Sequence, residues 1–375
     1  MKFFPARLAL LLFAALTSAQ SPPEAQSDGP YVVRNASGAW EAWSIAVTAD
    51  GARKSARLVR PNTTITVAAV GDLPAFDVTL RAAASVSPDT VTLPAKAKLF
   101  VVADMHGEYE ILARALVAHR IVNAQLAWSF GRGHLVVLGD VLDRGPNHTE
   151  ILWLLYELEA QARQAGGGVH LVLGNHETMV MRGDLRYLHP KYSRSAIVLG
   201  VDSYARLFDA RSVLGQWLRS RPAVLRIGRR LYLHGGLSRA LVERGYGLAA
   251  VNAGVRAALA DAPPAGVSAR ERAEFLMGPL GPLWYRGYFP EQADFPTASA
   301  ADIDAVLKHF DADTILVGHT IVPTITPLYG GKVIAVQVYP KREDATHAHF
   351  EALLIDGAKF QRATFDGTLQ PLDLH

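Results

Sequence analysis

The chain has 375 residues, half of them hydrophobic, and its charged residues (19%) are mixed along its length. This composition can bury a large core, and it excludes a disordered tail or a coiled coil as the main architecture. The formal net charge is +3, but two of the positive residues, Lys2 and Arg7, lie in the extreme N-terminus, and without them 36 basic residues face 35 acidic ones. No nucleic-acid partner is therefore expected.

Residues 1–19 have the layout of a secretory signal peptide. Lys2 and Arg7 precede an apolar run from Leu8 to Leu16, and the small residues of 17–19 follow it. The alternative is an uncleaved membrane anchor, but the run is shorter than the roughly 20 residues that a span needs. The sequence therefore predicts a secreted or periplasmic protein with no membrane contact beyond the export signal. Residues 20–30 form a polar linker.

The chain contains no cysteine. This excludes disulfides, zinc–thiolate sites, cysteine nucleophiles and iron–sulfur clusters. A chain without cysteine needs no oxidative folding step, which suits a bacterial periplasm or the external medium.

Residues 31–95 consist of short runs of alternating polar and apolar residues, separated by Gly, Asn, Asp and Pro. Such runs are typical of a small antiparallel β unit. The region has no cluster of His and Asp, so we assign it no chemistry. Trp40 and Trp43 could mark a binding surface, although packing against the next domain is the favoured interpretation.

The pattern changes in residues 96–375, where buried-strand runs alternate with helix-length segments. The first strand-like runs are 98–104, 134–140 and 169–175, with helical segments at 108–120 and 148–164; further apolar runs lie at 223–227, 231–233, 314–317, 333–338 and 350–355. This alternation predicts an α/β layered domain with ligand groups at the carboxyl ends of its strands.

Polar residues that could bind metals follow five of these strands. They are Asp104, His106, Asp140, Asn175, His234 and His319. Each motif alone has a simpler interpretation, such as a helix cap at Asp104 or Asn175, or a tight turn at His234. Together and in this order they predict one metal site. Oxygen and imidazole ligands without thiolates suit Mn, Fe, Zn or Co.

The motifs DxHG, GDxxDRG, GNHE, HGG and GH resemble those of the calcineurin-like metallophosphoesterase superfamily, in its phosphoprotein phosphatase branch. The segments GDLRYLHPKY at 183–192 and LWYRGY at 283–288 resemble most the Shewanella-like phosphatases. The resemblance covers about residues 97–340. It implies a metallophosphoesterase ββ-sandwich core flanked by helices, here preceded by the small N-terminal antiparallel β unit.

The resemblance also implies a role for each ligand. Asp104 and His106 bind the first of two metal ions (Mn, Fe or Zn), and Asp140 bridges both. The second ion takes Asn175, His234 and His319. A water between two cations loses a proton near neutral pH and attacks phosphorus.

The remaining polar residues of these motifs are assigned to proton transfer and phosphate binding. His176 protonates the leaving oxygen, and Asp143 holds the ring and raises its pKa. Arg144 grips phosphate oxygens. Arg286 is our first choice for a second phosphate clamp.

Two further residues are weaker substrate-binding candidates. Arg182, like Arg186, competes with Arg286 because it follows GNHE closely. Tyr285 either lines the site or packs in the core, and Trp284 is assigned to the core.

The expected reaction is hydrolysis of phosphomonoesters, either phosphotyrosine and phosphoserine proteins or small phosphate esters. Two alternatives stay open. One is a dinucleoside-polyphosphate hydrolase, and the other is a non-catalytic module that binds phosphate or a partner. The intact ligand set and His176 favour the enzyme.

Overall fold

The computed structural model describes residues 26–82, 85–93, 96–262, 264–292, 295–344 and 347–374. The predicted signal peptide and most of the predicted linker lie outside these residues. Within them, no helix combines the length and the apolar character needed to cross a membrane.

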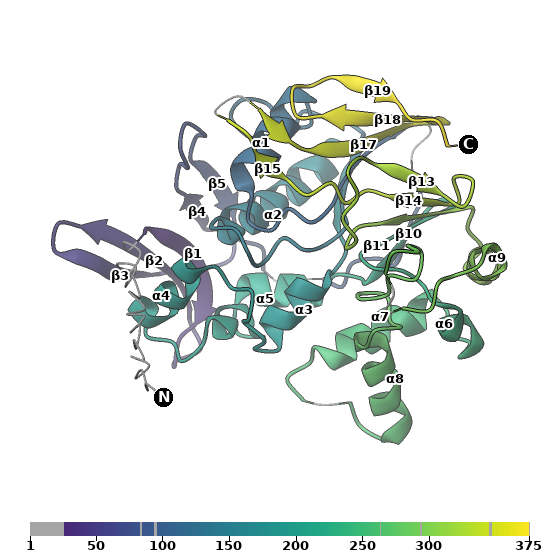
Figure 1. Cartoon of the computed structure of the whole chain (residues 1–375). Coiled ribbons are helices and arrows are strands. Elements are labelled where there is room, and N and C mark those ends of the chain that lie inside the picture. The colour runs from purple at the N-terminus through teal and green to yellow at the C-terminus, as the bar shows by residue number, and fades with distance from the viewer. Residues whose placement is uncertain are drawn as a thin grey trace, which may run out of the picture.

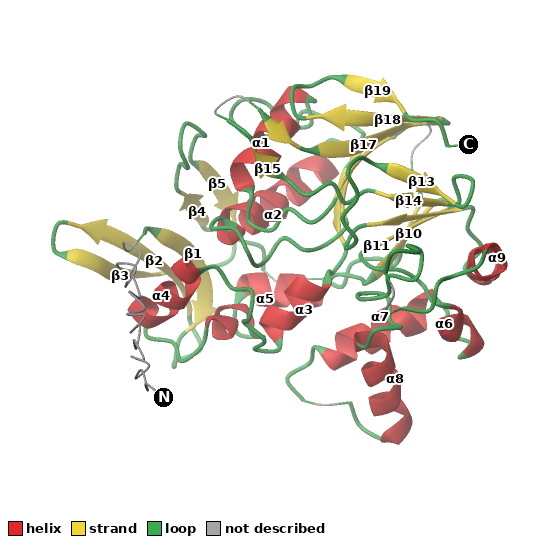
Figure 2. Cartoon of the chain, viewed as in Figure 1, coloured by secondary structure: helices red, strands yellow, loops and turns green. Residues whose placement is uncertain are grey.

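Two six-stranded mixed sheets form the core (Figures 1 and 2). The first has the order β19-β18-β17-β7-β8-β9, with β7 (Lys98–Val102), β8 (His134–Val137), β9 (Gly168–Leu171), β17 (Glu351–Asp356), β18 (Lys359–Thr364) and β19 (Leu369–Pro371). The second has the order β13-β14-β12-β11-β10-β6, with β6 (Thr90–Val91), β10 (Val224–Ile227), β11 (Arg230–Leu233), β12 (Thr314–Val317), β13 (Thr326–Leu328) and β14 (Val333–Ala335). The short strands β15 (Lys341–Arg342) and β16 (Ala348–His349) pair separately.

The central strands are almost entirely buried, which explains why they read as continuous apolar runs rather than alternating ones. β7, β8 and β9 are parallel, as are β11, β12 and β14. Parallel strands bring their carboxyl ends to one edge of a sheet, so the two groups of motif residues meet at one end of the sandwich.

Helices cover both sheets, with α2 against β9 and α7 against β10. They are α1 (Tyr109–Ala118), α2 (His148–Gln164), α3 (Asn175–Met181), α4 (Pro190–Leu199), α5 (Val213–Arg219), α6 (Arg239–Glu243), α7 (Leu248–Ala258), α8 (Val267–Met277) and α9 (Ala300–His309), with a 3₁₀ turn at Tyr204–Phe208. The predicted α/β class and the two-sheet sandwich with flanking helices are confirmed.

The N-terminal unit contains an antiparallel sheet of β1 (Asp28–Arg34), β2 (Trp40–Thr48) and β3 (Gly51–Leu58), and a hairpin of β4 (Thr64–Val67) and β5 (Phe76–Thr79). It differs from the prediction at both ends. β1 begins at Asp28, within the predicted linker, because this residue pairs with Ile45. The last predicted run contributes β6 to the core, where it pairs in parallel with β10.

Candidate metal centre

The loops at one end of the sandwich carry the predicted ligands. Asp104 and His106 follow β7, Asp140 follows β8, and Asn175 opens α3 after β9; His234 and His319 follow β11 and β12. All six side chains are buried, with at most 6% of their surface exposed. The structure therefore brings the predicted ligand set together.

Four donor atoms from different loops converge on one point. The Nε2 atom of His234 lies 2.8 Å from Asn175 Oδ1, 3.0 Å from His319 Nδ1 and 3.1 Å from Asp140 Oδ2. His234 Nδ1 lies 2.7 Å from the carbonyl oxygen of Leu138, which fixes the ring proton on Nδ1. His234 Nε2 therefore faces two oxygen atoms, an arrangement that a proton or a cation stabilises, and the donor set suits a borderline divalent metal.

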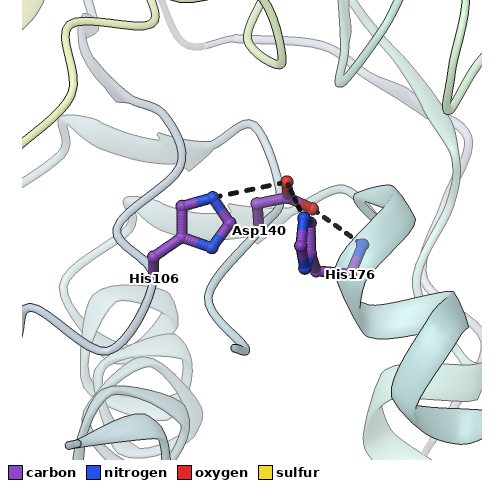
Figure 3. A group of neighbouring side chains, drawn as sticks. All are labelled: His106, Asp140 and His176. Atoms are coloured by element: carbon purple, nitrogen blue, oxygen red, sulfur yellow. Dashed lines mark hydrogen bonds and ion pairs between the residues drawn. The ribbon is translucent and has the colours of Figure 1, made fainter. Parts of the chain in front are cut away.

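Figure 3 shows His106, Asp140 and His176, whose donor atoms lie within 4.8 Å of one another and form a second candidate group that shares Asp140. His106 Nδ1 lies 2.9 Å from the carbonyl oxygen of Leu142, which leaves Nε2 directed at Asp140 Oδ2, 3.7 Å away. The Asp104 carboxylate accepts the backbone N–H of His319 at 3.1 Å. Asp140 thus stands between two sets of ligands, as a bridging carboxylate must.

The protonation of these buried groups indicates a need for positive charge. Burial, opposed by His234 and reinforced by Asp140, raises the pKa of Asp104 to about 7. Burial lowers the pKa of His106 to about 3. Burial also opposes charge on His234, but Asp140 and Asp104 outweigh it and raise the pKa to about 9. The raised pKa values of Asp104 and His234 favour bound protons in this cluster, and divalent cations would compete with those protons.

The backbone of the site is strained where the ligands lie. Left-handed φ angles occur at Asp104 (45°), His106 (43°), Asp140 (54°) and His319 (64°). Such conformations are unfavourable for residues with a Cβ and persist only where the surroundings hold them, typically at functional sites. They turn each chain sharply after its strand and aim the side chain into the site.

Glu177 organises the backbone beneath the metal ligands. Its carboxylate is fully buried and accepts four backbone N–H groups, those of Asp140 (2.8 Å), Val141 (2.7 Å), Leu142 (3.0 Å) and Gly174 (2.8 Å). It therefore fixes the loop after β8 to the start of α3. The cap residue of α3 is Gly174, not Asn175, which corrects the simpler interpretation of GNHE as a corner capped by asparagine.

His176 lies beside the ligands and is held by a second carboxylate. Its Nδ1 is 2.7 Å from Asp143 Oδ2, and Nε2 is 3.8 Å from Asp140 Oδ2. Burial lowers the pKa of His176, but Asp140 and the hydrogen bond to Asp143 outweigh this effect and leave the pKa above its ordinary value. The Asp143 contact therefore favours the protonated form of the His176 ring.

A pocket of about 200 Å³ opens onto these residues. It is lined by the ligands Asp104, His106, Asp140 and His319, by His176, and by Arg144, Arg286, Gln292, Thr320, Ile321 and Gln337. Arg286 donates to the carbonyl oxygen of His319 at 2.9 Å, and burial lowers its pKa. Two cationic side chains therefore face the site from opposite loops.

The other predicted substrate-binding residues lie elsewhere. Arg182 lines a separate pocket between α3 and α7–α8, and its competitor Arg186 pairs with Asp184 on the surface. Tyr285 is buried and packs edge-on against Tyr288, so it has the core role. Neither Arg182 nor Tyr285 is among the lining residues of the site pocket, whereas Arg286, which follows Tyr285 directly, is.

Trp284 packs edge-on against the ligand His319, with ring centroids 5.8 Å apart, so this core residue also supports the site.

Sequence reasoning missed two tyrosines beside the site. The ring of Tyr187 lies 5.2 Å from that of His176 and is 46% exposed. The ring of Tyr339 lies 6.1 Å from that of His106 and 5.8 Å from the guanidinium of Arg144. Tyr187 belongs to the segment GDLRYLHPKY, so the motif was visible, but its contact with His176 depends on how the loop folds back.

Comparisons with known proteins agree with this arrangement. The family model described as calcineurin-like phosphoesterase matches residues 97–323. Shewanella-like protein phosphatase 2 of Arabidopsis thaliana is 36% identical over 94 residues, 25% of this chain and 24% of that protein. Shewanella-like protein phosphatase 1 of Plasmodium berghei is 23% identical over 60% of this chain and 62% of that protein. The chain thus spans less than two thirds of these curated relatives.

Among solved structures, the crystal structure of a cold-active protein-tyrosine phosphatase of a psychrophilic Shewanella species matches with a TM-score of 0.78. The two chains are 34% identical over 93% of this chain and 100% of the other. The likeness therefore includes the N-terminal unit as well as the core.

Proposed function

The chain belongs to the calcineurin-like phosphoesterase family, and on that basis we propose that it is a binuclear metal-dependent phosphatase that hydrolyses phosphomonoesters. The observation that carries the proposal is that three imidazoles, two carboxylates and one amide form two adjoining buried groups that share Asp140, beside the His176–Asp143 pair. A non-catalytic binding module would need the ligands but not the separate proton donor.

The donor set fits two borderline metal ions, such as Mn, Fe or Zn. Asp104 and His106 would hold one ion, Asn175, His234 and His319 the other, and Asp140 both. When bound, the two ions supply an activated water and neutralise the charge of the phosphoryl group. The protein fixes the ligand geometry through the Nδ1 contacts of His106 and His234 with backbone carbonyls.

His176 would donate a proton to the leaving oxygen. The ring is kept in place by Asp143, whose side chain is completely buried, and the Asp143 charge favours the protonated imidazole. Nδ1 faces Asp143, so the proton that is given up is the one on Nε2, on the side of the metal ligands. This is general acid catalysis by a positioned imidazolium.

Arg144 and Arg286 would hold the phosphoryl oxygens from two sides of the pocket. A planar guanidinium can form two parallel hydrogen bonds to such oxygens, which orients the phosphoryl group as well as attracting it. Arg286 already donates to the carbonyl of His319, so its position is tied to a metal ligand.

We favour an aryl phosphate such as phosphotyrosine as substrate. The exposed ring of Tyr187 lies against His176, the residue that must face the leaving group, so an aromatic leaving group would find an aromatic surface there. The name of the similar Shewanella enzyme, a protein-tyrosine phosphatase, supports the same choice. A bis(5'-nucleosyl)-tetraphosphatase of Neisseria meningitidis matches at 25% identity over 37% of this chain, which keeps dinucleoside polyphosphates as the second candidate.

The experiment is a turnover assay on chelator-treated protein, with and without added Mn²⁺, using p-nitrophenyl phosphate. Metal-dependent hydrolysis is expected. If the protein shows no such hydrolysis, the proposed phosphatase function is refuted. A phosphotyrosine peptide, a phosphoserine peptide and diadenosine tetraphosphate then rank the substrates. His176→Asn should lower turnover by about 10²–10⁴-fold while leaving metal content unchanged.

We also propose that the protein is exported, on the basis of residues 1–19 and the lack of cysteine. Fusion of residues 1–25 to a reporter that is active only outside the cytoplasm tests this. A fusion that stays inactive would argue against export.

A further inference from the structure

The segment 183–192, GDLRYLHPKY, wraps the turn that carries Asp143 and Arg144. The backbone N–H of Arg144 donates to the carbonyl oxygen of Tyr187 at 3.0 Å. Two residues later, the carbonyl oxygen of Pro146 accepts two hydrogen bonds, from Lys191 Nζ at 2.8 Å and from the Tyr192 hydroxyl at 2.7 Å. The segment therefore holds both arms of the turn.

The turn needs such support because its backbone is strained. Asp143 and Arg144 adopt left-handed φ angles of 69° and 66°. Gly145, which follows, donates its N–H to the carbonyl of His106 at 2.8 Å, and a Cβ at this position would collide with that oxygen. Two successive left-handed residues persist only when neighbouring contacts fix them. Release of the Pro146 carbonyl would let the turn relax and move Asp143.

Lys191 is held by two buried carboxylates from different parts of the chain. Its side chain is 5% exposed, and Nζ lies 3.5 Å from Asp28 Oδ1 and 3.7 Å from Glu150 Oε1. Asp28 belongs to β1 of the N-terminal unit, whereas Glu150 belongs to α2. A buried ammonium needs such partners, because removing one leaves charge uncompensated.

The N-terminal unit is itself anchored at this point. The indole N–H of Trp153 in α2 donates to the carbonyl of Pro30 at 2.7 Å, and the Tyr31 hydroxyl donates to Asp28 Oδ2 at 2.7 Å. The position of Asp28 is therefore also held by contacts that do not involve Lys191. Figure 1 shows α4 beside β2 and β3 of the same N-terminal unit, and these elements are in contact.

We propose that Lys191 is a positioning residue for the general-acid pair, and that Asp28 of the N-terminal unit holds its ammonium in place. Lys191 touches no reacting atom and acts through the Pro146 carbonyl on Asp143. The N-terminal unit is then a part of the active-site scaffold rather than an appended module. The kinetic side of this proposal rests on the phosphatase function proposed above; the structural side does not.

The simpler alternative is that Lys191 only fastens the N-terminal unit to α4. The chain offers a matched control in Lys54 of β3, whose Nζ donates to the carbonyl of Leu199 at the other end of α4, 3.1 Å away, and stacks on Trp43. Both lysines join the N-terminal unit to α4, but only Lys191 reaches the turn. Lys54→Met and Lys191→Met therefore separate fastening from positioning.

The test compares kcat for phenyl phosphate, whose leaving group needs protonation, with kcat for p-nitrophenyl phosphate, whose leaving group needs little. Lys191→Met should lower kcat for phenyl phosphate by about 10²-fold, as expected for a misplaced catalytic group, and for p-nitrophenyl phosphate by less than about 5-fold. Asp28→Asn, a smaller change that keeps the side-chain shape, should move the same ratio in the same direction. Lys54→Met should lower thermal stability and leave the ratio unchanged.

A second readout needs no turnover. The Nδ1 proton between His176 and Asp143 gives an imidazole N–H resonance in ¹⁵N-labelled protein, identified by its loss in His176→Asn. It should shift in Lys191→Met and Asp28→Asn but not in Lys54→Met. Wild-type protein without metal-dependent turnover would refute the phosphatase function, and the resonance would still decide the positioning role. The proposal is overturned if Lys191→Met keeps the wild-type position of the His176 Nδ1–H resonance and the wild-type ratio of kcat for the two substrates.

Discussion

Asp143→Asn tests the proton donor without disturbing the ligands. Asp143 is completely buried, and its Oδ2 lies 2.7 Å from His176 Nδ1. Its Oδ1 has no hydrogen-bond partner among the described residues, so the charge acts mainly on the His176 ring. Asparagine keeps the shape and an acceptor oxygen but removes the charge.

The size of the effect follows from this contact. A hydrogen bond between charged groups is worth about 1.5–3 kcal/mol, so loss of this stabilisation of the imidazolium should lower kcat by about 10-fold to 150-fold. The effect should be largest for phenyl phosphate and smallest for p-nitrophenyl phosphate, because only the former depends strongly on protonation.

The pH dependence of kcat tests the same acid pair independently, through the direction in which its alkaline limb moves. His176 must carry its proton to act, so activity is lost as the pH rises through its pKa. In the metal-free structure, Asp140 and Asp143 raise that pKa against the effect of burial, and the Asp143 contribution does not pass through a metal ligand. Asp143→Asn removes one of the charges that raise the pKa of His176, so the alkaline limb of the kcat profile should move to lower pH.

The assay is steady-state kinetics at several pH values on metal-loaded protein, with metal content measured in parallel. Asp184→Asn is the matched control, because Asp184 lies near the site but pairs with Arg186 on the surface. An alkaline limb that stays in place in Asp143→Asn, or an equal loss for both substrates, would refute the assignment of His176 and Asp143 as the acid pair.

Three further changes test other parts of the site. Gly174→Ala should reduce metal content and kcat, because the added Cβ would collide with the Asp140 carboxylate. Gly247→Ala is the control: a Cβ there meets nothing within 4 Å, so neither quantity should change. Glu177→Gln should lower the free energy of unfolding by about 2–3 kcal/mol, measured by urea denaturation, since an amide cannot accept all four backbone N–H groups; an unchanged midpoint would contradict this. Arg286→Lys should raise KM for p-nitrophenyl phosphate about 10-fold, whereas Arg182→Ala, outside the site pocket, should leave KM within about 2-fold.

The sandwich was predictable because its inner strands are buried on both faces. Runs such as 135–138 and 315–317 are apolar throughout and end directly before polar motifs, so both their type and their position could be recognised. The C-terminal strands β18 and β19 were not predicted, because β18 is only partly buried and β19 is exposed and has three residues. β6 was placed in the wrong sheet, since its two residues gain a partner only through the long-range pairing with β10.

The ligand set was predictable for a related reason. Side chains that follow parallel strands meet at one edge, so strand order alone brings Asp104, Asp140 and Asn175 together. The supporting residues were not predictable, because their roles depend on contacts across loops. Glu177 works through backbone groups of another loop, and Lys191 through a carbonyl reached from a different helix. No local pattern reports such contacts.

The central place of β7 determines when during synthesis the enzyme can become complete. β7 pairs with β8 on one side and with β17, near the end of the chain, on the other. All six ligands precede β17, but the strand that aims Asp104 and His106 keeps an open edge until residues 351–356 have emerged from the ribosome. A nascent chain therefore carries all six ligand residues before β7 has both of its neighbours, and domains with such long-range pairings complete late.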